Sequence, residues 1–374
     1  MAPRATTTSI TTPGVAAPHP DSRRGRGAIT NRTGRFESTV RVERDAGFDY
    51  AHLTEDPPPA LRTSVTIDST RTIIAHNESP DIPFDQSINP YRGCEHGCIY
   101  CFARPTHAFL GLSPGLDFES RLFAKPDAAT LLAKELRAPG YRCRLIALGT
   151  NTDPYQPLER QMAITREVLQ VLLAFNHPVG IVTKSVLVTR DIDVLARLAE
   201  KRLVQVMLSV TTLDHRLARS MEPRASTPGK RIEAIERLAA AGVPVGVMVA
   251  PVIPALNDHE IEGILEQARA AGAKAAAYVL LRLPHEIKDL FQEWLREHVP
   301  DRADRVLRHI RDARRGRLND PEFGSRMRGE GPYAVLIARR FRVAATKFGF
   351  GTLAKPRDDL FAPPPAAGDQ LRLW

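Results

Sequence analysis

Three cysteines in one short loop are the residues of this sequence with the most distinctive chemistry. Cys94, Cys98 and Cys101 have the spacing C-x3-C-x2-C within the glycine-punctuated run NPYRGCEHGCIYCFARPTH. Thiolates bind soft metals, and a tight loop can direct three sulfurs at one site. Four cysteines in 374 residues are too few for a disulfide scaffold. The spacing therefore indicates a metal centre.

Three ligands leave a metal centre incomplete, and two kinds of centre could follow. In a 4Fe-4S cluster, one iron would lack a protein ligand and could take a substrate or cofactor. In a structural zinc site, the fourth ligand would be His96, His107 or Cys143. Zinc ligands usually come as two separated pairs, whereas these three cysteines are contiguous with no matching pair. The spacing favours the cluster.

The elements that must position these cysteines alternate from residue 84 onwards. Short apolar runs are followed by longer helical runs, which predicts parallel strands buried on both faces. No G-x-G-x-x-G follows the first strand, which argues against a nucleotide-binding doubly wound sheet. We expect an α/β fold, a partial (β/α)6 TIM-like barrel with N- and C-terminal extensions, whose chemistry lies at the carboxyl ends of the strands. The expected strands are 86–92, 144–149, 179–183, 204–210, 243–252 and 275–281, and the expected helices are 127–136, 160–175, 192–201, 230–241, 259–271 and 286–297.

The regions that flank this barrel differ from it in composition. The first residues are rich in Thr, Pro, Ser and Arg without periodicity, which predicts disorder. Three β-prone runs follow, at 38–42, 64–67 and 72–74. The expected division is a disordered tail at 1–36, an N-terminal extension at 37–83, the core barrel at 84–300 and a basic C-terminal helical extension at 301–374.

Composition narrows the class of protein further. Hydrophobic residues make up 43% and charged residues 25%, values that exclude a fibrous or wholly disordered chain. No run reaches the roughly 18 consecutive apolar residues of a membrane span, and the N-terminus has no apolar core of a secretory signal. We therefore expect a cytoplasmic protein with no membrane contact.

The net charge of +9 is concentrated near the two ends of the chain. Residues 301–350 hold 13 Lys and Arg against 6 Asp and Glu, and residues 1–50 hold 8 against 5. This distribution suggests an anionic partner such as nucleic acid, and the alternative is a solvated arginine-rich helix. Aromatic residues make up only 6% of the chain, so we expect no platform for stacking bases.

The cysteine spacing, with Tyr100 before the third cysteine and the loop after the first expected strand, resembles that of radical S-adenosylmethionine (radical SAM) enzymes. The resemblance implies that Cys94, Cys98 and Cys101 bind three irons of a 4Fe-4S cluster, that SAM chelates the fourth, and that a flavodoxin- or ferredoxin-type protein donates electrons. Further runs look like those of the branch related to spore photoproduct lyase and resemble a bacterial family within it. These runs are GTNTDPYQPLE at 149–159, TKS at 183–185, LSVTT at 208–212, MEPRASTPGKR at 221–231 and APVIPALND at 250–258.

The resemblance also implies a set of SAM contacts at the strand ends. Tyr100 belongs to the cofactor-binding set, and Gly149 and Asp153 would lie near the amino group of SAM, where a glycine lets backbone approach and a carboxylate can accept from an ammonium. Lys184 could pair with the methionyl carboxylate, and Ser209 could bond ribose or carboxylate. The apolar stretch 249–253 would pack on adenine, with plain barrel core as its alternative.

Charged and hydrogen-bonding groups above the strand ends are candidates for catalysis. Asp153 and Tyr155 lie in the expected loop after the second strand, and Glu222 and Arg224 lie in the loop after the fourth. Each could contact substrate or SAM. The alternative for Glu222 is a structural ion pair with Arg224 or Lys230.

One departure from the lyase pattern bears on the reaction. Photoproduct lyases have a hydrogen-donating cysteine after the second strand, and alignment on Asp153 puts Thr150 there. A hydroxyl donates a hydrogen atom less readily than a thiol, and Cys143 would lie at the wrong end of the barrel as a small buried hydrophobe. We therefore expect a radical SAM enzyme that is not a photoproduct lyase, acting on an unknown substrate for which nucleic acid is a candidate. The alternative function is a non-catalytic, zinc-stapled nucleic-acid-binding protein.

Overall fold

A seven-stranded sheet forms the centre of the computed structural model, which describes residues 23–37 and 60–365. Six strands are parallel, and β2 pairs antiparallel with β3 at one edge. The predicted α/β core of six parallel strands is confirmed, and in the described chain the strands form an open row. Their order is β10 (Ala275–Leu280), β9 (Val245–Val252), β8 (Val204–Ser209), β7 (Val179–Thr183), β6 (Ile146–Leu148), β3 (Gln86–Ile88) and β2 (Ile74–His76).

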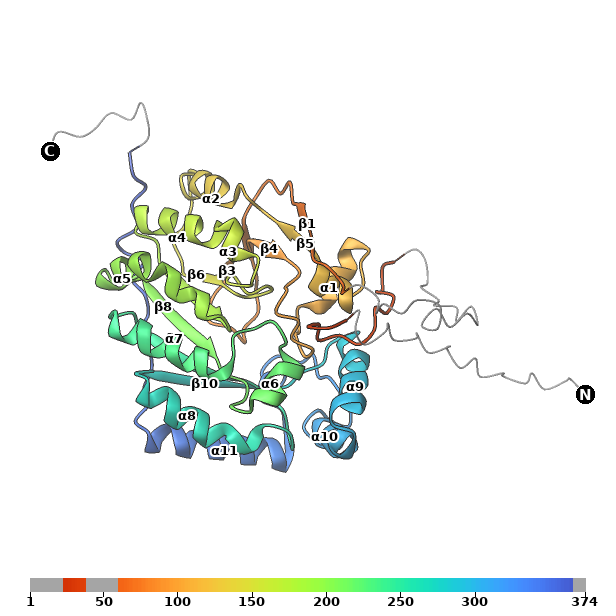
Figure 1. The fold of residues 1–374 in the computed structure, drawn as a ribbon. Coiled ribbons are helices and arrows are strands. Elements are labelled where there is room, and N and C mark those ends of the chain that lie inside the picture. Colours follow the sequence, from red (N-terminus) through yellow and green to blue (C-terminus); the bar gives the residue numbers. More distant parts are fainter. Residues whose placement is uncertain (1–22, 38–59, 366–374) are drawn as a thin grey trace, which may run out of the picture.

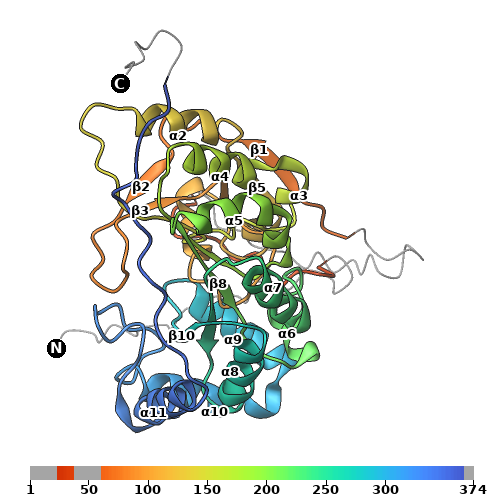
Figure 2. The same ribbon diagram turned by 90° about the vertical axis from the view of Figure 1, so that its left-hand side faces the viewer.

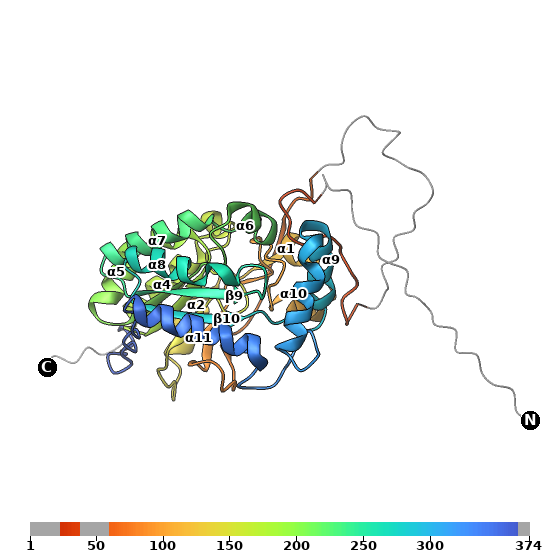
Figure 3. The same ribbon diagram turned by 90° about the horizontal axis from the view of Figure 1, so that it is seen from below.

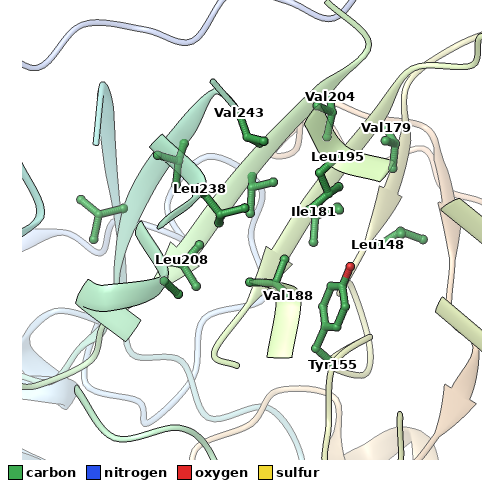
Figure 4. Packing of buried hydrophobic residues seen from close by; sticks show 14 of the residues in the cluster. Leu148, Tyr155, Val179, Ile181, Val188, Leu195, Val204, Leu208, Leu238 and Val243 are labelled. Carbon is green, nitrogen blue, oxygen red and sulfur yellow. The ribbon is translucent and has the colours of Figure 1, made fainter. Parts of the chain in front are cut away.

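Helices that follow the strands cover one face of this sheet (Figure 1). Their apolar residues recur at helical spacing, as in α5 (Ile192–Glu200), which buries Val194, Leu195 and Leu198. The cluster of buried side chains between strands and helices is the main core, shown in Figure 4. The other helices of this layer are α2 (Ala128–Leu136), α4 (Ile164–Ala174), α7 (Pro228–Ala240) and α8 (Ile261–Ala270).

The expected first strand, 86–92, is divided between two sheets. Its first part is β3, and its last two residues form β4 (Tyr91–Arg92), which pairs antiparallel with β5 (Arg121–Ala124). Sequence patterns did not predict β5, which also pairs parallel with β1 (Ser64–Ile67). The expected run 64–67 is thus a strand, whereas 38–42 lies outside the described residues. This small sheet holds both ends of the segment that contains the cysteines.

The prediction of a disordered tail at 1–36 is wrong for residues 23–36, and residues 1–22 lie outside the described chain. Ala28, Ile29 and Thr30 are buried. The segment lies beside α1 (Leu116–Ser120) and α9 (Ile287–His298) (Figure 3). Hydrogen bonds to α1 and α9 hold the segment in this position. Because polar side chains make these bonds, a composition without apolar periodicity did not reveal that the segment is ordered.

A loop from the C-terminal region lies along the open edge of β10. Between α10 (Pro300–Asp312) and α11 (Gly331–Lys347), the Met327 carbonyl accepts a 2.9 Å bond from the Leu280 amide. The buried Arg314 guanidinium donates to the carbonyls of Leu280 and Leu281 at 3.1 and 2.9 Å. These bonds pair edge groups of β10 that would otherwise be exposed.

The expected C-terminal helical extension is helical only as far as Lys347. Beyond it the chain runs along the amino-terminal edge of the sheet towards α2 (Figure 2). The Gly351 amide donates to the Lys274 carbonyl just before β10, and the Ala362 amide donates to the Phe175 carbonyl before β7, each at 3.0 Å. Within the described segments, no helix is long and apolar enough to cross a membrane.

Candidate active site

The cysteine loop follows β4 and lies at the carboxyl ends of the parallel strands. The Cys94 amide donates to the Phe118 carbonyl of α1 at 2.9 Å. The Ile99 amide donates to the Met221 carbonyl of α6 (His215–Met221) at 3.0 Å. Cys94 and Cys98 are buried, Cys101 is partly exposed, and none of them forms a disulfide. The loop is therefore held by its backbone on two sides while its thiols stay free.

A buried arginine at the start of the 3-10 helix η2 (Arg104–Leu110) binds the backbone of the cysteine loop. The Arg104 guanidinium donates to the carbonyls of Gly97 and Cys98 at 3.0 and 2.8 Å and pairs with Glu119 at 2.5 Å, with both side chains fully buried. Glu119 in turn accepts the amides of Gly27 and Ala28, each at 2.8 Å. Sequence reasoning missed this pair, and the signal was a lone arginine three residues after the last cysteine. Arg104 also donates to the carbonyls of Pro114 and Gly115.

The loop is tied to its neighbour along the sheet by Gln156, a member of the predicted second loop. Its side-chain oxygen accepts the Glu95 amide at 2.9 Å, and its side-chain nitrogen donates to the Gly93 carbonyl at 3.2 Å. Gln156 is fully buried. A glutamine amide has one acceptor and donors on one planar group, so it can fix two points of the loop backbone at once.

Asp153, predicted to meet SAM, bonds instead to three loops of the protein. Its carboxylate accepts the Thr183 hydroxyl at 2.6 Å and the Lys184 amide at 2.8 Å, and it lies 3.3 Å from the imidazole of His96. Burial would raise the pKa of Asp153, but these partners outweigh it and lower that pKa to about 2. Asp153 is therefore a charged tie between the loops after β4, β6 and β7. Its contact with SAM stays a prediction.

Glu222 occupies a buried ion pair, as the structural alternative foresaw, but with a different partner. It pairs with Arg231 of α7, not with Arg224 or Lys230. Its other oxygen accepts the Tyr100 hydroxyl. Arg231 was not singled out, although it ends the quoted run MEPRASTPGKR. Glu222 thereby fixes Tyr100 and the loop after β8, and its catalytic role stays a prediction.

Lys184 directly follows β7 and Ser209 is the last residue of β8, and their contacts with SAM stay predictions. The Lys184 ammonium lies 5.7 Å from the centre of the Tyr100 ring, and no described carboxylate forms an ion pair with it. Burial and Glu222 raise the pKa of the Cys98 thiol, and Lys184 opposes them. Ser209 is buried, and its carbonyl accepts Arg231 at 3.0 Å. A cation thus stands beside the second cysteine, available for an anionic group.

Tyr155 does not line the mouth of the sheet, so its predicted catalytic role is wrong. Its side chain is fully buried in the main core, where Figure 4 shows it near Leu148, Ile181 and Val188. Burial, together with the nearby Asp191 carboxylate, raises its pKa well above the usual range. A phenol in this position cannot reach a substrate above the strand ends.

Arg224 and Gly149 have structural partners of their own. The Arg224 guanidinium, about a third exposed, pairs with Glu95 at 3.0 Å. Gly149 has φ of +90°, and a Cβ on it would lie 2.0 Å from the Val182 carbonyl oxygen, so only glycine fits there. Their contacts with substrate and SAM stay predictions.

In this structure the three thiols are not gathered as the ligands of a single metal ion. Among residues 23–37 and 60–365, no three His, Cys, Asp or Glu side chains lie close enough to hold one metal ion. Thiolates around one zinc ion, at about 2.3 Å each, must lie within about 4 Å of one another, whereas the irons of a cluster hold their ligands further apart. The proposed fourth zinc ligands are also occupied or distant. His96 faces Asp153, His107 bonds the Arg121 carbonyl, and Cys143 precedes β6 at the amino end.

The thiols also need a positive charge to ionise where they are. Burial raises the pKa of Cys94 well above its usual value, and Asp153 and Cys98 raise it further. Burial likewise raises that of Cys98. Iron ions would replace these protons, because metal binding releases protons from ligand thiols. The donor set therefore fits an iron–sulfur cluster.

An open α/β sheet with a three-cysteine loop after its first parallel strand is the arrangement expected above for a radical SAM enzyme. The family model described as the Radical SAM superfamily matches residues 88–268. The chain belongs to the radical SAM superfamily, which implies a 4Fe-4S cluster, SAM as cofactor and a reductant.

Uncharacterized relatives and solved structures of similar fold were also found. An uncharacterized protein of Mycobacterium tuberculosis is 38% identical over 265 residues, covering 70% of this chain and 76% of that one. One of Methanocaldococcus jannaschii is 28% identical over 174 residues, covering 46% and 62%. Spore photoproduct lyase complexed with dinucleoside spore photoproduct is 15% identical with a TM-score of 0.56, covering 76% and 80%. A variant of that lyase with bound AdoMet is 14% identical with a TM-score of 0.57, and the coverage of both chains is the same. These two structures show a shared fold.

Replacing Gly27 with alanine should loosen the N-terminal segment from the cysteine loop. A Cβ on Gly27 would lie 1.8 Å from the Gly97 carbonyl oxygen, so the backbone must shift. We expect the free energy of unfolding to fall by about 1–3 kcal/mol, as for other overpacked sites, measured by urea denaturation. The control is Gly229→Ala in α7, where the added Cβ meets nothing within 4 Å. Equal stability of the two variants would contradict the steric argument.

Proposed function

We propose that this chain is a radical SAM enzyme that binds a 4Fe-4S cluster through Cys94, Cys98 and Cys101 and removes a hydrogen atom from a substrate held at the carboxyl ends of the strands. The supporting observation is that three free thiols share one loop and that Lys184, whose charge acts on the Cys98 thiol, has no carboxylate partner among the described residues. When bound, the cluster supplies one electron to SAM, which gives methionine and a 5′-deoxyadenosyl radical that takes hydrogen from the substrate.

The chain's own residues would bind and orient SAM. Lys184 would pair with the methionyl carboxylate, because its ammonium has no ion-pair partner among the described residues. Ser209 would donate to ribose or carboxylate, and the Gly149 backbone would approach the amino group. Asp153 would act on SAM through the position of the Lys184 backbone, which it holds by a 2.8 Å bond. The buried Val252 and Ile253 would exclude water beside the adenine.

The reaction proposed differs from that of a photoproduct lyase. The Thr150 hydroxyl donates to the Asn89 side chain at 3.2 Å. Threonine has no thiol that could donate a hydrogen atom at this position. Cys143 precedes β6 at the opposite end of the strand. The electron would come from a flavodoxin- or ferredoxin-type protein, and a cytoplasmic location stays a prediction.

The test is anaerobic reconstitution of the full chain with iron and sulfide, followed by dithionite and SAM. We expect equal amounts of 5′-deoxyadenosine and methionine, and none when the reductant is omitted. Iron and zinc contents measured on the same sample separate the cluster from the zinc alternative. An intact, reduced cluster that yields no deoxyadenosine would overturn the proposal.

A further inference from the structure

A cleft of about 650 Å³ opens beside the cysteine loop, between η2 and the chain that follows β10. Phe102, which directly follows Cys101, lines it together with Phe109 of η2. From the other side it is lined by Arg282, Lys288 and Arg317. Arg282 is near enough to Cys101 for the thiolate to act on its charge. The cleft therefore adjoins the metal loop without being part of it.

Three of the cations that line this cleft have no ion-pair partner among the described residues. Arg282 is partly buried with its guanidinium 4.7 Å from the Phe102 ring centre, and neither it nor the exposed Lys288 and Arg317 forms an ion pair within the described ranges. Burial lowers the pKa of Arg282, and Arg326 lowers it further. The acid of the lining, Asp320, is engaged by the Ser325 hydroxyl at 2.7 Å and the Glu322 amide. Three cations without ion-pair partners outnumber this one charged carboxylate, so the lining favours an anion.

Two further arginines frame the cleft but are neutralised by partners. Arg35 pairs with Glu286 at 2.7 Å. Arg326, near the basic end of the chain, pairs with Asp81. The basic C-terminal region was predicted to bind an anionic partner such as nucleic acid. Much of its charge lies instead on exposed positions of α10 or in such pairs, so only part of it faces this cleft. The free charge at the cleft comes mainly from the chain after β10.

Exposed aromatic rings accompany these cations. Phe109 is 70% exposed and stacks on Phe36 with ring centres 4.9 Å apart, and Phe102 is 46% exposed. The low aromatic content predicted no platform for stacking bases, but the structure gathers three of the chain's phenylalanines here. Such rings are costly to leave in water and suit a flat, apolar partner.

We propose that this cleft binds a nucleoside phosphate unit, with its base against Phe102 and Phe109 and its phosphate held by Arg282, Lys288 and Arg317. A base supplies the flat ring and a phosphate the anion, and arginine forks match phosphate oxygens. The unit could belong to a free nucleotide or to a single strand of nucleic acid. That this ligand is the substrate rests on the proposed function, whereas the binding itself does not.

The experiment measures anisotropy of a fluorescein-labelled single-stranded DNA oligonucleotide, and of the same sequence as RNA, on the reconstituted full chain without SAM. Unlabelled AMP and the matching duplex serve as competitors. Phe109→Ala and the double variant Lys288→Gln/Arg317→Gln should each weaken binding about tenfold. The double variant should also reduce the slope of log K against log salt by about 0.7 for each lost phosphate contact.

The matched control is Arg237→Gln/Lys274→Gln, which removes the same charge from the exposed face of α7 and the amino end of β10. It should bind like the parent chain. AMP competing as well as the strand indicates a free nucleotide, and competition by the strand alone indicates nucleic acid; either supports the cleft. Cleft variants that bind unchanged, a control that weakens as much, or tighter binding of duplex than of single strand would overturn it.

Binding and turnover separate this inference from the proposed function. If the strand or nucleotide binds but no deoxyadenosine forms from an intact cluster, the enzyme proposal fails and the cleft stands. If deoxyadenosine forms while the cleft variants bind the probes like the parent chain, the cleft proposal fails alone.

Discussion

Replacing Cys98 with alanine should abolish deoxyadenosine formation and lower the iron content, while Cys143→Ala leaves both unchanged. Both variants make the same chemical change, the loss of one thiol from an incompletely exposed side chain. They differ in place, since Cys98 lies at the carboxyl ends of the strands, where the charges of Lys184 and Glu222 act on it, and Cys143 precedes β6 at the other end. With two thiolates left, a cluster would have two irons without protein ligands instead of one.

Iron content, deoxyadenosine yield and thermal unfolding of the two reconstituted variants check this expectation. Cys98 is 8% exposed, so alanine removes only a small buried group and the fold should persist. Unfolding measured without iron separates a lost ligand from a lost fold. A Cys98→Ala protein that keeps its iron and activity would refute the ligand assignment, and so would an equal loss in Cys143→Ala.

The elements of the barrel were predictable because each leaves a local signal in the sequence. The expected strand 179–183 coincides with β7, since a short apolar run between two helices has no other place to be buried. The cysteine loop could also be predicted from a local pattern, because its three cysteines lie within eight residues of sequence. Local patterns did not reveal β5, which exists because it pairs with two strands distant from it in the chain.

The three cysteines of the site could be predicted from the sequence, whereas the residues that hold their loop in position could not. Tyr155 was a candidate because it carries a hydrogen-bonding group in the loop after a strand end, but the direction of a side chain in a loop depends on what packs around it, and here it faces the core. The pairs Arg104 with Glu119 and Glu222 with Arg231 join residues that no periodic pattern connects. Such partners emerge only when the fold brings their loops together.

The Arg104–Glu119 pair should be the most sensitive polar contact for stability. Both side chains are fully buried, and Glu119→Ala would leave the Arg104 guanidinium without a counter-charge and the Gly27 and Ala28 amides without their acceptor. Removing one partner of a buried pair costs about 3–5 kcal/mol. We expect that loss in the free energy of unfolding, measured by urea denaturation, together with faster loss of iron from the reconstituted protein.

Two further variants make the test of this pair specific. Glu233→Ala removes the same side chain from an exposed pair with Lys230 on α7 and should leave stability nearly unchanged. Glu119→Gln keeps an oxygen that can accept one amide, so it should fall between Glu119→Ala and the parent chain even if the alanine variant does not fold. If Glu119→Gln and Glu233→Ala unfold at the same urea concentration as the parent chain, the pair does not hold the cysteine loop. In that case its backbone bonds to Phe118 and Met221 must suffice to position the thiols.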